Sequence, residues 1–236
     1  MGTDQAVRLI KARQGMPSLD NKPMNRPTCA TCLRAQSTCI CRWITPTPHS
    51  VNVLILQHPM EVHQAKGSAR LLHLSLPRSQ LLVGETFDTT DLQTRLAAAH
   101  AVLLYPSTPA QATLAQATQT HSCQVQASQP KDAPQLATML PADTGQLCLV
   151  VLDATWRKSR KMLHCNPLLQ QLPRLSLQDL PAPRYSIRKA HRHEQRSTLE
   201  ATCAALALLE GRAAPYAPLL AAFDGFVAQQ LIYSQR

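Results

Sequence analysis

The chain has 236 residues and a formal net charge of +10 at neutral pH, with 44% apolar and 16% charged residues. This length allows one substantial hydrophobic core, or a core with a small appended module. The apolar fraction excludes a disordered chain, and no apolar run approaches the length of a membrane span. Residues 1–15 lack the apolar centre of a secretory signal, so we expect a cytoplasmic protein.

The positive charge is concentrated between Asp153 and Arg196, where ten cations stand against three acids. A solvated basic face usually carries interleaved acids, so this stretch favours a polyanionic partner, and nucleic acid is the usual one in the cytoplasm. The chain has only 7 glycines, and neither a G-x-G-x-x-G nor a P-loop pattern occurs. A nucleotide-like cofactor would therefore need a different kind of loop.

Residues 1–27 are polar and without periodicity, which predicts a flexible tail. A C-x2-C-x6-C-x-C pattern follows, formed by Cys29, Cys32, Cys39 and Cys41. Two close cysteine pairs on tight turns can place four thiolates at the corners of a tetrahedron, as zinc requires. Disulfides are disfavoured by the expected compartment. Four sulfur ligands leave no open position for catalysis, so we predict a structural zinc module over residues 28–48.

From residue 49 onward, apolar strand patterns alternate with helical patterns. The predicted strands span 51–57, 80–87, 101–107 and 146–153. The predicted helices span 64–76, 89–100, a basic segment directly after 153, 197–210 and an amphipathic 216–233. The alternation indicates an α/β domain with a mostly parallel sheet. Residues 108–146 are rich in Ala, Gln, Thr and Pro and fit weak helices and linkers equally well.

Polar residues follow three of the predicted strands. Asp153 ends "LCLVVLD", Tyr105 and Pro106 follow "VLL", and "QHPME" follows "VLIL". Ligands bind beyond the carboxyl ends of strands in open α/β sheets, so three polar strand ends predict a ligand cleft. Two local explanations stay open: Asp153 or Thr155 as a helix N-cap, and Trp156 as an ordinary core residue.

Neither local explanation accounts for the four cations that come next. They are Arg157, Lys158, Arg160 and Lys161. Cations on most sides of one helix repel each other unless a polyanion lies against them. A second basic segment precedes the helix predicted at 197–210. There Ser197 and Glu200 form a capping-box pattern, which is a sufficient local explanation, although such a helix end also suits a carboxylate or phosphate.

Taken together, these segments resemble the DTW-domain family, the tRNA-uridine aminocarboxypropyltransferases. The D-x-T-W motif is present as Asp153, Ala154, Thr155 and Trp156, followed by R-K-S-R-K-M. The cysteine pattern, "QHPME", "LLYPS", "LPRLSL", "YSIRK" and "STLEA" occur in the order that the family shows. The resemblance runs from about Cys29 to the last helix and leaves out the tail and the Ala/Gln/Thr-rich stretch.

The resemblance implies a reaction and a fold. The 3-amino-3-carboxypropyl group of S-adenosylmethionine would be transferred to N3 of a uridine in tRNA, with release of methylthioadenosine. The fold would be related to the SPOUT methyltransferases, whose backbone knot forms the cofactor pocket, and residues 49–236 would be the catalytic domain. Uridine N3 is a poor nucleophile until its proton leaves, so we expect Asp153 to act as the general base.

The resemblance also implies the remaining site residues. The expected S-adenosylmethionine contacts are Tyr105, Pro106, Thr155, Trp156, Tyr185, Ser197, Thr198 and Glu200. The expected RNA contacts are Arg157, Lys158, Arg160, Lys161, Arg188, Lys189 and Arg192. The expected partner is tRNA, with no membrane and no obligate protein partner. Two alternatives stay open: an RNA methyltransferase of SPOUT type, and a zinc-bearing RNA-binding protein without catalysis.

Overall fold

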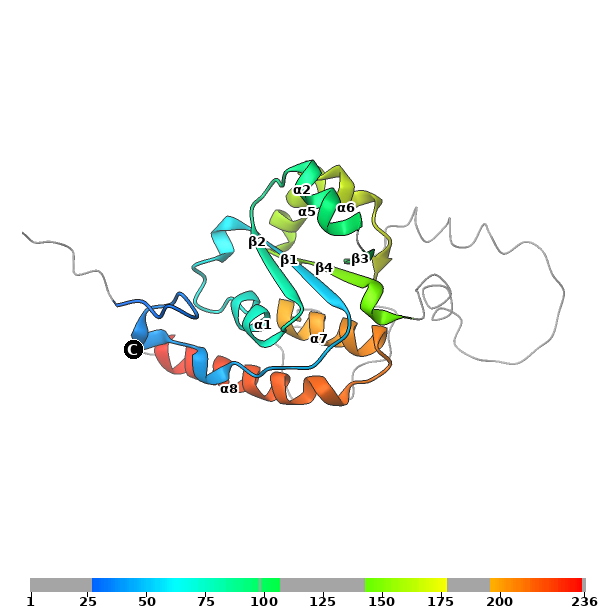
Figure 1. Ribbon diagram of the computed structural model, residues 1–236. Helices are drawn as coiled ribbons and strands as arrows, with labels where there is room; N and C mark the ends of the chain where they lie inside the picture. The colour runs from blue at the N-terminus through cyan, green and yellow to red at the C-terminus, as the bar shows by residue number, and fades with distance from the viewer. Residues whose placement is uncertain (1–26, 98, 107–142, 178–195, 235–236) are drawn as a thin grey trace, which may run out of the picture.

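The computed structural model describes residues 27–97, 99–106, 143–177 and 196–234. They form a five-stranded sheet in the order β2-β1-β4-β3-β5, and all its strand pairs are parallel (Figure 1). The strands are β1 (Asn52–Gln57), β2 (Ser79–Val83), β3 (His100–Leu104), β4 (Leu147–Asp153) and β5 (Arg174–Leu175). The predicted α/β architecture with a parallel sheet is therefore confirmed.

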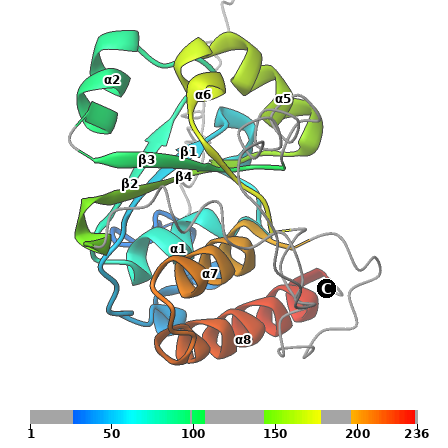
Figure 2. The same ribbon diagram turned by 90° about the vertical axis from the view of Figure 1, so that its right-hand side faces the viewer.

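Helices cover both faces of this sheet (Figure 2). On one side, α1 (Ala69–Ser75) and α7 (Thr198–Leu209) lie against the sheet, and α8 (Ala217–Ser234) packs outside them (Figure 2). The opposite layer consists of α2 (Thr89–Ala97), α5 (Trp156–Cys165) and α6 (Pro167–Gln171). Side chains alternate along a strand, so Ile55 and Leu149 join the first core, whereas Leu54 and Val150 join the second. Burial on both faces explains why the central strands β1 and β4 are almost continuously apolar.

The connections after β1 and β4 leave the sheet toward opposite layers. The β1 connection runs through a short 3-10 helix, η3 (Pro59–Glu61), to α1, whereas β4 leads into α5. The two strands are neighbours, and Gln57 lies opposite Asp153 in their register. Neighbouring parallel strands whose connections diverge in this way mark the usual ligand position of an open α/β sheet. The topology therefore places the expected ligand position at the carboxyl ends of β1 and β4.

The cysteine segment packs on the main core. Cys32 and Ile40 are buried in the same apolar cluster as Phe226 of α8. Trp43, in the 3-10 helix η2 (Cys41–Trp43), lies against Gly225 of α8, where an added methyl group would overlap the indole ring. Residues 28–48 thus share the core of the sheet domain. Their folding as a unit apart from 49–236 stays a prediction.

Some predicted elements begin or end elsewhere. The helix predicted from residue 64 starts at Ala69, because Arg34 donates hydrogen bonds to the carbonyl oxygens of Ala65 (2.6 Å) and Gly67 (3.0 Å) and holds them in a turn. The strand predicted over 80–87 ends at Val83. Both β5 and α6 lie in a Leu/Pro-rich segment for which no element was predicted.

Several predictions fall outside the described residues. They include the tail up to residue 26, the Ala/Gln/Thr-rich stretch up to residue 142, and residues 178–195 between β5 and α7. The relation to SPOUT enzymes and the backbone knot stay predictions. Within the described ranges, no helix has the length and apolar character needed to cross a membrane.

Candidate active site and metal centre

Asp153 is held by two neutral hydrogen-bond donors from different elements. Gln57, the last residue of β1, donates from Nε2 to one carboxylate oxygen over 2.8 Å. Thr198, the first residue of α7, donates from Oγ1 to the other over 2.7 Å. Three elements thus meet at one carboxylate, which is only 7% exposed. Each carboxylate oxygen has two lone pairs, so each can still accept a second hydrogen bond or a proton.

The surroundings of Asp153 make its carboxylate a better proton acceptor. Burial raises the pKa of its carboxyl group above the ordinary value, and the hydrogen bonds from Thr198 and Gln57 oppose this shift only in part. The nearby charge of Glu61 raises the pKa further. A carboxylate with a raised pKa is a stronger base than an exposed one.

The two local explanations for this motif do not hold. Thr155 occupies the N-cap position of α5, but its side chain makes no capping hydrogen bond, and Asp153 bonds elsewhere. Trp156 is no core residue, since 57% of it is exposed.

Trp156 nevertheless has a fixed aromatic neighbour. Tyr105, directly after β3, meets it with 5.6 Å between ring centroids and 71° between ring planes. The Tyr105 hydroxyl lies 3.4 Å from Oγ of Ser159. The Arg174 guanidinium lies 5.2 Å from the Tyr105 ring centroid and donates to the carbonyl oxygen of Pro106 over 3.0 Å. Residues of β5, the β3 end and α5 therefore form one cluster.

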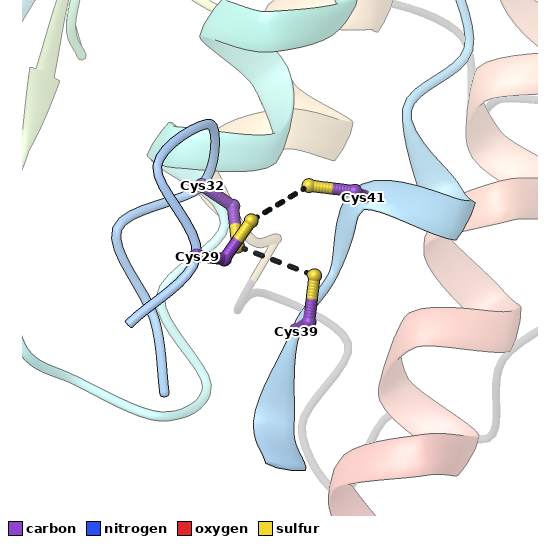
Figure 3. A group of neighbouring side chains, drawn as sticks. All are labelled: Cys29, Cys32, Cys39 and Cys41. Carbon is purple, nitrogen blue, oxygen red and sulfur yellow. Dashed lines mark hydrogen bonds between the residues drawn. The ribbon is translucent and has the colours of Figure 1, made fainter. Parts of the chain in front are cut away.

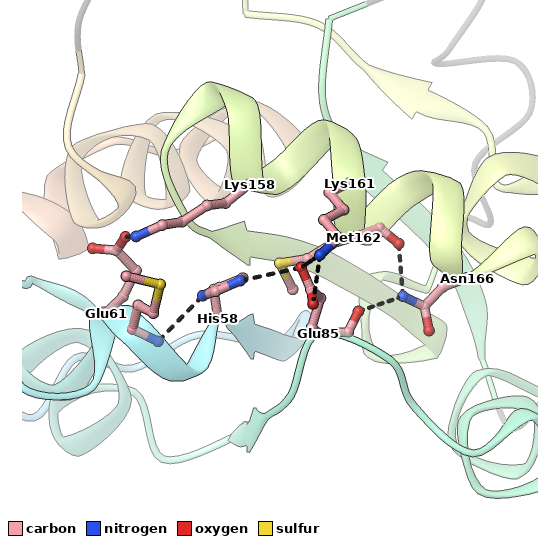
Figure 4. Close-up of polar contacts among 8 residues, drawn as sticks. His58, Glu61, Glu85, Lys158, Lys161, Met162 and Asn166 are labelled. Carbon is pink, nitrogen blue, oxygen red and sulfur yellow. Dashed lines mark hydrogen bonds and ion pairs between the residues drawn. The ribbon is translucent and has the colours of Figure 1, made fainter.

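Two lysines of α5 form ion pairs with the segments that follow β1 and β2 (Figure 4). Nζ of Lys158 lies 2.7 Å from the Glu61 carboxylate, and Nζ of Lys161 lies 2.9 Å from that of Glu85. The His58 ring nitrogen Nε2 lies 3.4 Å from the same Glu85 carboxylate. The hydrogen bond and charge of Lys161 lower the pKa of Glu85. These pairs hold α5 over the carboxyl ends of the two strands.

The two arginines of α5 differ from its lysines. Arg157 and Arg160 are exposed, and neither forms an ion pair with another residue in the described ranges. Lys158, by contrast, is only 23% exposed in its side chain. The four cations predicted to contact RNA thus divide into two lysines with acidic partners and two arginines without one among the described residues.

The capping box predicted at the start of α7 is present. Ser197 Oγ accepts a hydrogen bond from the Glu200 backbone N–H over 3.2 Å, and the Glu200 carboxylate accepts one from the Ser197 backbone N–H over 2.9 Å. The Leu199 N–H donates to Ser68 Oγ over 3.3 Å. These contacts already satisfy several polar groups at this helix end, and Thr198 is the residue that reaches Asp153.

The four cysteines of the N-terminal pattern come together as predicted (Figure 3). All four sulfur atoms lie within 4.8 Å of one another, with 3.5 Å between Cys29 and Cys41 and 3.7 Å between Cys32 and Cys39. A tetrahedral zinc ion with bonds of about 2.3 Å has its sulfur ligands about 3.8 Å apart, so the cluster fits such an ion.

The backbone favours a thiolate at Cys29, whereas burial raises the pKa of Cys41 to about 12. Hydrogen bonds from the backbone at Cys32 and Thr31 lower the pKa of Cys29 to about 6. The thiolate is the form that binds a metal. None of the four cysteines forms a disulfide.

The sequence profile described as the DTW domain matches residues 26–231, which include the cysteine cluster, the sheet and Asp153. The chain belongs to the DTW-domain family.

This DTW domain is similar to three curated proteins named tRNA-uridine aminocarboxypropyltransferase 2. The Drosophila melanogaster protein is 28% identical over 198 residues, which cover 80% of this chain and 69% of that protein. The Macaca fascicularis and Mus musculus proteins are each 25% identical over 192 residues, which cover 78% of this chain and 57% of theirs. The chain thus spans little more than half of the two mammalian relatives. No solved structure matches the chain.

Within the DTW domain, the structure brings some predicted residues together and not others. Thr198 contacts Asp153, while Tyr105 contacts Trp156. Tyr185, Arg188, Lys189 and Arg192 lie outside the described residues. Gln57 begins the polar strand end "QHPME", but its contact with Asp153 was not predicted, because the two residues lie 96 positions apart. Arg174 was counted among the cations, but no signal in the sequence links it to Tyr105.

Proposed function

We propose that this DTW-domain protein is a tRNA-uridine aminocarboxypropyltransferase. It transfers the 3-amino-3-carboxypropyl group of S-adenosylmethionine to N3 of a uridine in tRNA and releases methylthioadenosine. The observation that carries the proposal is the buried carboxylate of Asp153, held by Gln57 and Thr198 where the β1 and β4 connections diverge. The names of the three relatives support the same reaction.

Asp153 is the catalytic base in this proposal. Its carboxylate accepts the proton from N3, because the neutral nitrogen is a poor nucleophile. The N3 electron pair then forms a bond to the methylene carbon beside the donor's sulfonium. The bond between that carbon and sulfur breaks, and its electron pair stays on sulfur, which leaves as the neutral thioether of methylthioadenosine. Gln57 and Thr198 are positioning residues that fix the direction of the carboxylate.

Other residues bind the two substrates. The donor lies at the carboxyl edge of the sheet, near Tyr105, Pro106 and Thr198, a position that suits a nucleotide-like ligand without a glycine-rich loop. Arg157 and Arg160 bind tRNA phosphates. The location is cytoplasmic.

We propose zinc as the metal of the cysteine cluster. Cys29, Cys32, Cys39 and Cys41 would hold it, and four thiolates leave no open position, so it supplies folding stability rather than chemistry. The cluster lies on the α8 side of the core, where Trp43 packs against Gly225.

Two labelled forms of S-adenosylmethionine test the reaction. Purified protein is incubated with unmodified tRNA and donor labelled either in the methyl group or in the carboxyl carbon, and the label in precipitated tRNA is counted. We expect only the carboxyl label to enter the tRNA. Entry of only the methyl label would instead show a methyltransferase. No entry of either label from a preparation that binds S-adenosylmethionine would contradict transfer to the tRNA used.

A pair of matched variants ties the reaction to the site. Asp153→Asn should lose transfer and keep tRNA affinity. Asp91→Asn changes an exposed acid of α2 that pairs with Arg95, and it should transfer at the normal rate. Equal activity of the two variants would show that Asp153 is not the catalytic base.

A further inference from the structure

Trp156 is exposed in a way that packing does not explain. A residue with 57% exposure contributes little to the core, and large apolar side chains on a surface commonly mark interaction sites. The indole is also anchored. Tyr105 meets it at 71°, and Tyr105 itself contacts Arg174 and Ser159. An anchored, exposed aromatic ring loses little conformational freedom when a flat ligand stacks on it.

The charges around this ring favour a nucleic acid. In a helix, residues four positions apart lie one above the other on the same face, so Arg160 lies one turn from Trp156. Arg157 is the next residue along. Both arginines are exposed and unpaired within the described ranges, whereas Lys158 and Lys161 are engaged with acids (Figure 4). Exposed aromatic rings beside unpaired cations are the usual means of binding single-stranded nucleic acid, with bases stacked and phosphates neutralised.

Trp156 is also close to the proposed base. Three residue steps separate it from Asp153, which limits the distance between their Cα atoms to about 11 Å. N3 of uridine lies on the edge that forms base pairs, so a carboxylate reaches it only when the base is unpaired. Enzymes that act on a base generally take it out of the stack and provide a new stacking surface for it.

We propose that the exposed indole of Trp156 is the platform on which the unstacked target uracil lies, with Arg160 and Arg157 holding the adjoining phosphates. This inference rests on the proposed function and changes the role expected for Trp156 from a donor contact to a base contact. Small-molecule sites bury most of their ligand, whereas an open ring flanked by arginines suits one base of a larger polyanion.

Photochemical cross-linking tests the contact directly. A tRNA transcript is made with 5-bromouridine in place of uridine, bound to the full-length protein and irradiated, and the cross-linked peptide is identified by mass spectrometry. Halogenated uracils cross-link efficiently to aromatic rings on which they stack. We expect the modified residue to be Trp156. Cross-links confined to other residues would overturn the proposal that the uracil stacks on Trp156.

Affinity measurements separate the uracil from the donor's adenine. In Trp156→Ala, the affinity for a uridine-containing tRNA loop should fall roughly 5- to 150-fold, the range expected when one base loses its stacking partner. Trp156→Phe should keep most of the affinity. The affinity for S-adenosylmethionine should be unchanged in both variants. A fall in S-adenosylmethionine affinity with unchanged RNA affinity would assign the ring to the donor and overturn the proposal.

A control and an independent readout complete the test. Ile232→Ala truncates another exposed apolar side chain, on α8, and should change neither affinity. Binding and cross-linking need no turnover. A cross-link at Trp156 in a protein that transfers no label would leave the platform standing and remove the proposed reaction. Normal transfer with no cross-link at Trp156 would remove the platform alone.

Discussion

Gln57 and Asp153 end two neighbouring parallel strands, and the Gln57 amide donates to the Asp153 carboxylate over 2.8 Å. Because this hydrogen bond stabilises the charged form, it counteracts the rise in the pKa of Asp153 that burial causes. The pair therefore sets the pH range in which the carboxylate is ionised.

Gln57→Leu should move the pH–rate profile toward higher pH. Loss of the donor raises the pKa of Asp153, and a general base works only when it is ionised, so the rising limb of kcat against pH shifts upward. Thr198→Val should shift it in the same direction. Gln93→Leu, on the exposed side of α2, is the control and should leave the profile in place. An unchanged limb in both site variants would show that the two donors do not act on the base.

Asp153→Asn should lower the transfer rate about 10²- to 10⁴-fold, the usual contribution of a general base. Its stability at pH 7 should equal or exceed that of the native protein. The raised pKa of Asp153 means that its contribution to stability is present below the unfolded pKa and is lost as pH rises through the folded value. Thermal unfolding midpoints measured from pH 4 to 8 check the direction of this pH dependence. A strongly destabilised Asn variant at pH 7 would indicate that Asp153 mainly holds the fold together.

Arg160→Gln and Lys161→Gln should differ in RNA binding, although each removes one positive charge. Arg160 has no acidic partner among the described residues, whereas Lys161 pairs with Glu85 over 2.9 Å. The Arg160 change should lower by about one the slope of log affinity for tRNA against log salt concentration. The Lys161 change should alter that slope less. Equal slopes in the two variants would contradict the division of the α5 cations.

Metal removal should destabilise the protein. We expect about one zinc ion per chain by elemental analysis, and a lower unfolding midpoint after chelation. Cys32→Ser should lose the metal, because it removes a buried ligand of the cluster. Cys165→Ser, at the end of α5, should keep it. A metal-free protein with an unchanged midpoint would show that the four thiols need no ion.

Gly225→Ala should destabilise the protein by about 1–3 kcal/mol, the usual cost of overpacking. Alanine is the better helix former by about 1 kcal/mol, so a destabilised variant would identify the Trp43 indole as the cause. Adding Trp43→Leu to Gly225→Ala should restore part of the loss. Denaturant unfolding of the two single variants and the double variant measures this coupling. Additive effects would mean that the two residues do not touch.

Local patterns were sufficient to predict much of this fold. The apolar runs of β1 and β4 predicted central strands because both faces of these strands are buried. The basic run after Asp153 predicted α5, and the spacing of four cysteines predicted their cluster. The two-residue strand β5 has no such pattern, since it is added to the sheet by its position beside β3.

The site could be predicted only in part. Asp153 stands out because an acid ends an apolar strand. Its partners do not, since Gln57 reaches it through the register of two strands and Thr198 through the packing of α7 on the sheet. The ion pairs of Lys158 and Lys161 likewise depend on acids that precede them by 97 and 76 residues. Such contacts between distant parts of the chain leave no local signal.

The packing of α8 on the cysteine segment has a consequence for how the protein is made. Gln229 donates to the carbonyl oxygen of Cys39, and Tyr233 donates to that of Ser37, across 190 and 196 residues of sequence. Translation produces the cysteines long before α8, so the four thiols of a nascent chain are accessible before the surface that covers the cluster exists. A chain truncated before α8 would carry an uncovered cysteine cluster, because Phe226 would be missing from the core that contains Cys32. Synthesis of α8 is therefore required before the cysteine cluster can be covered.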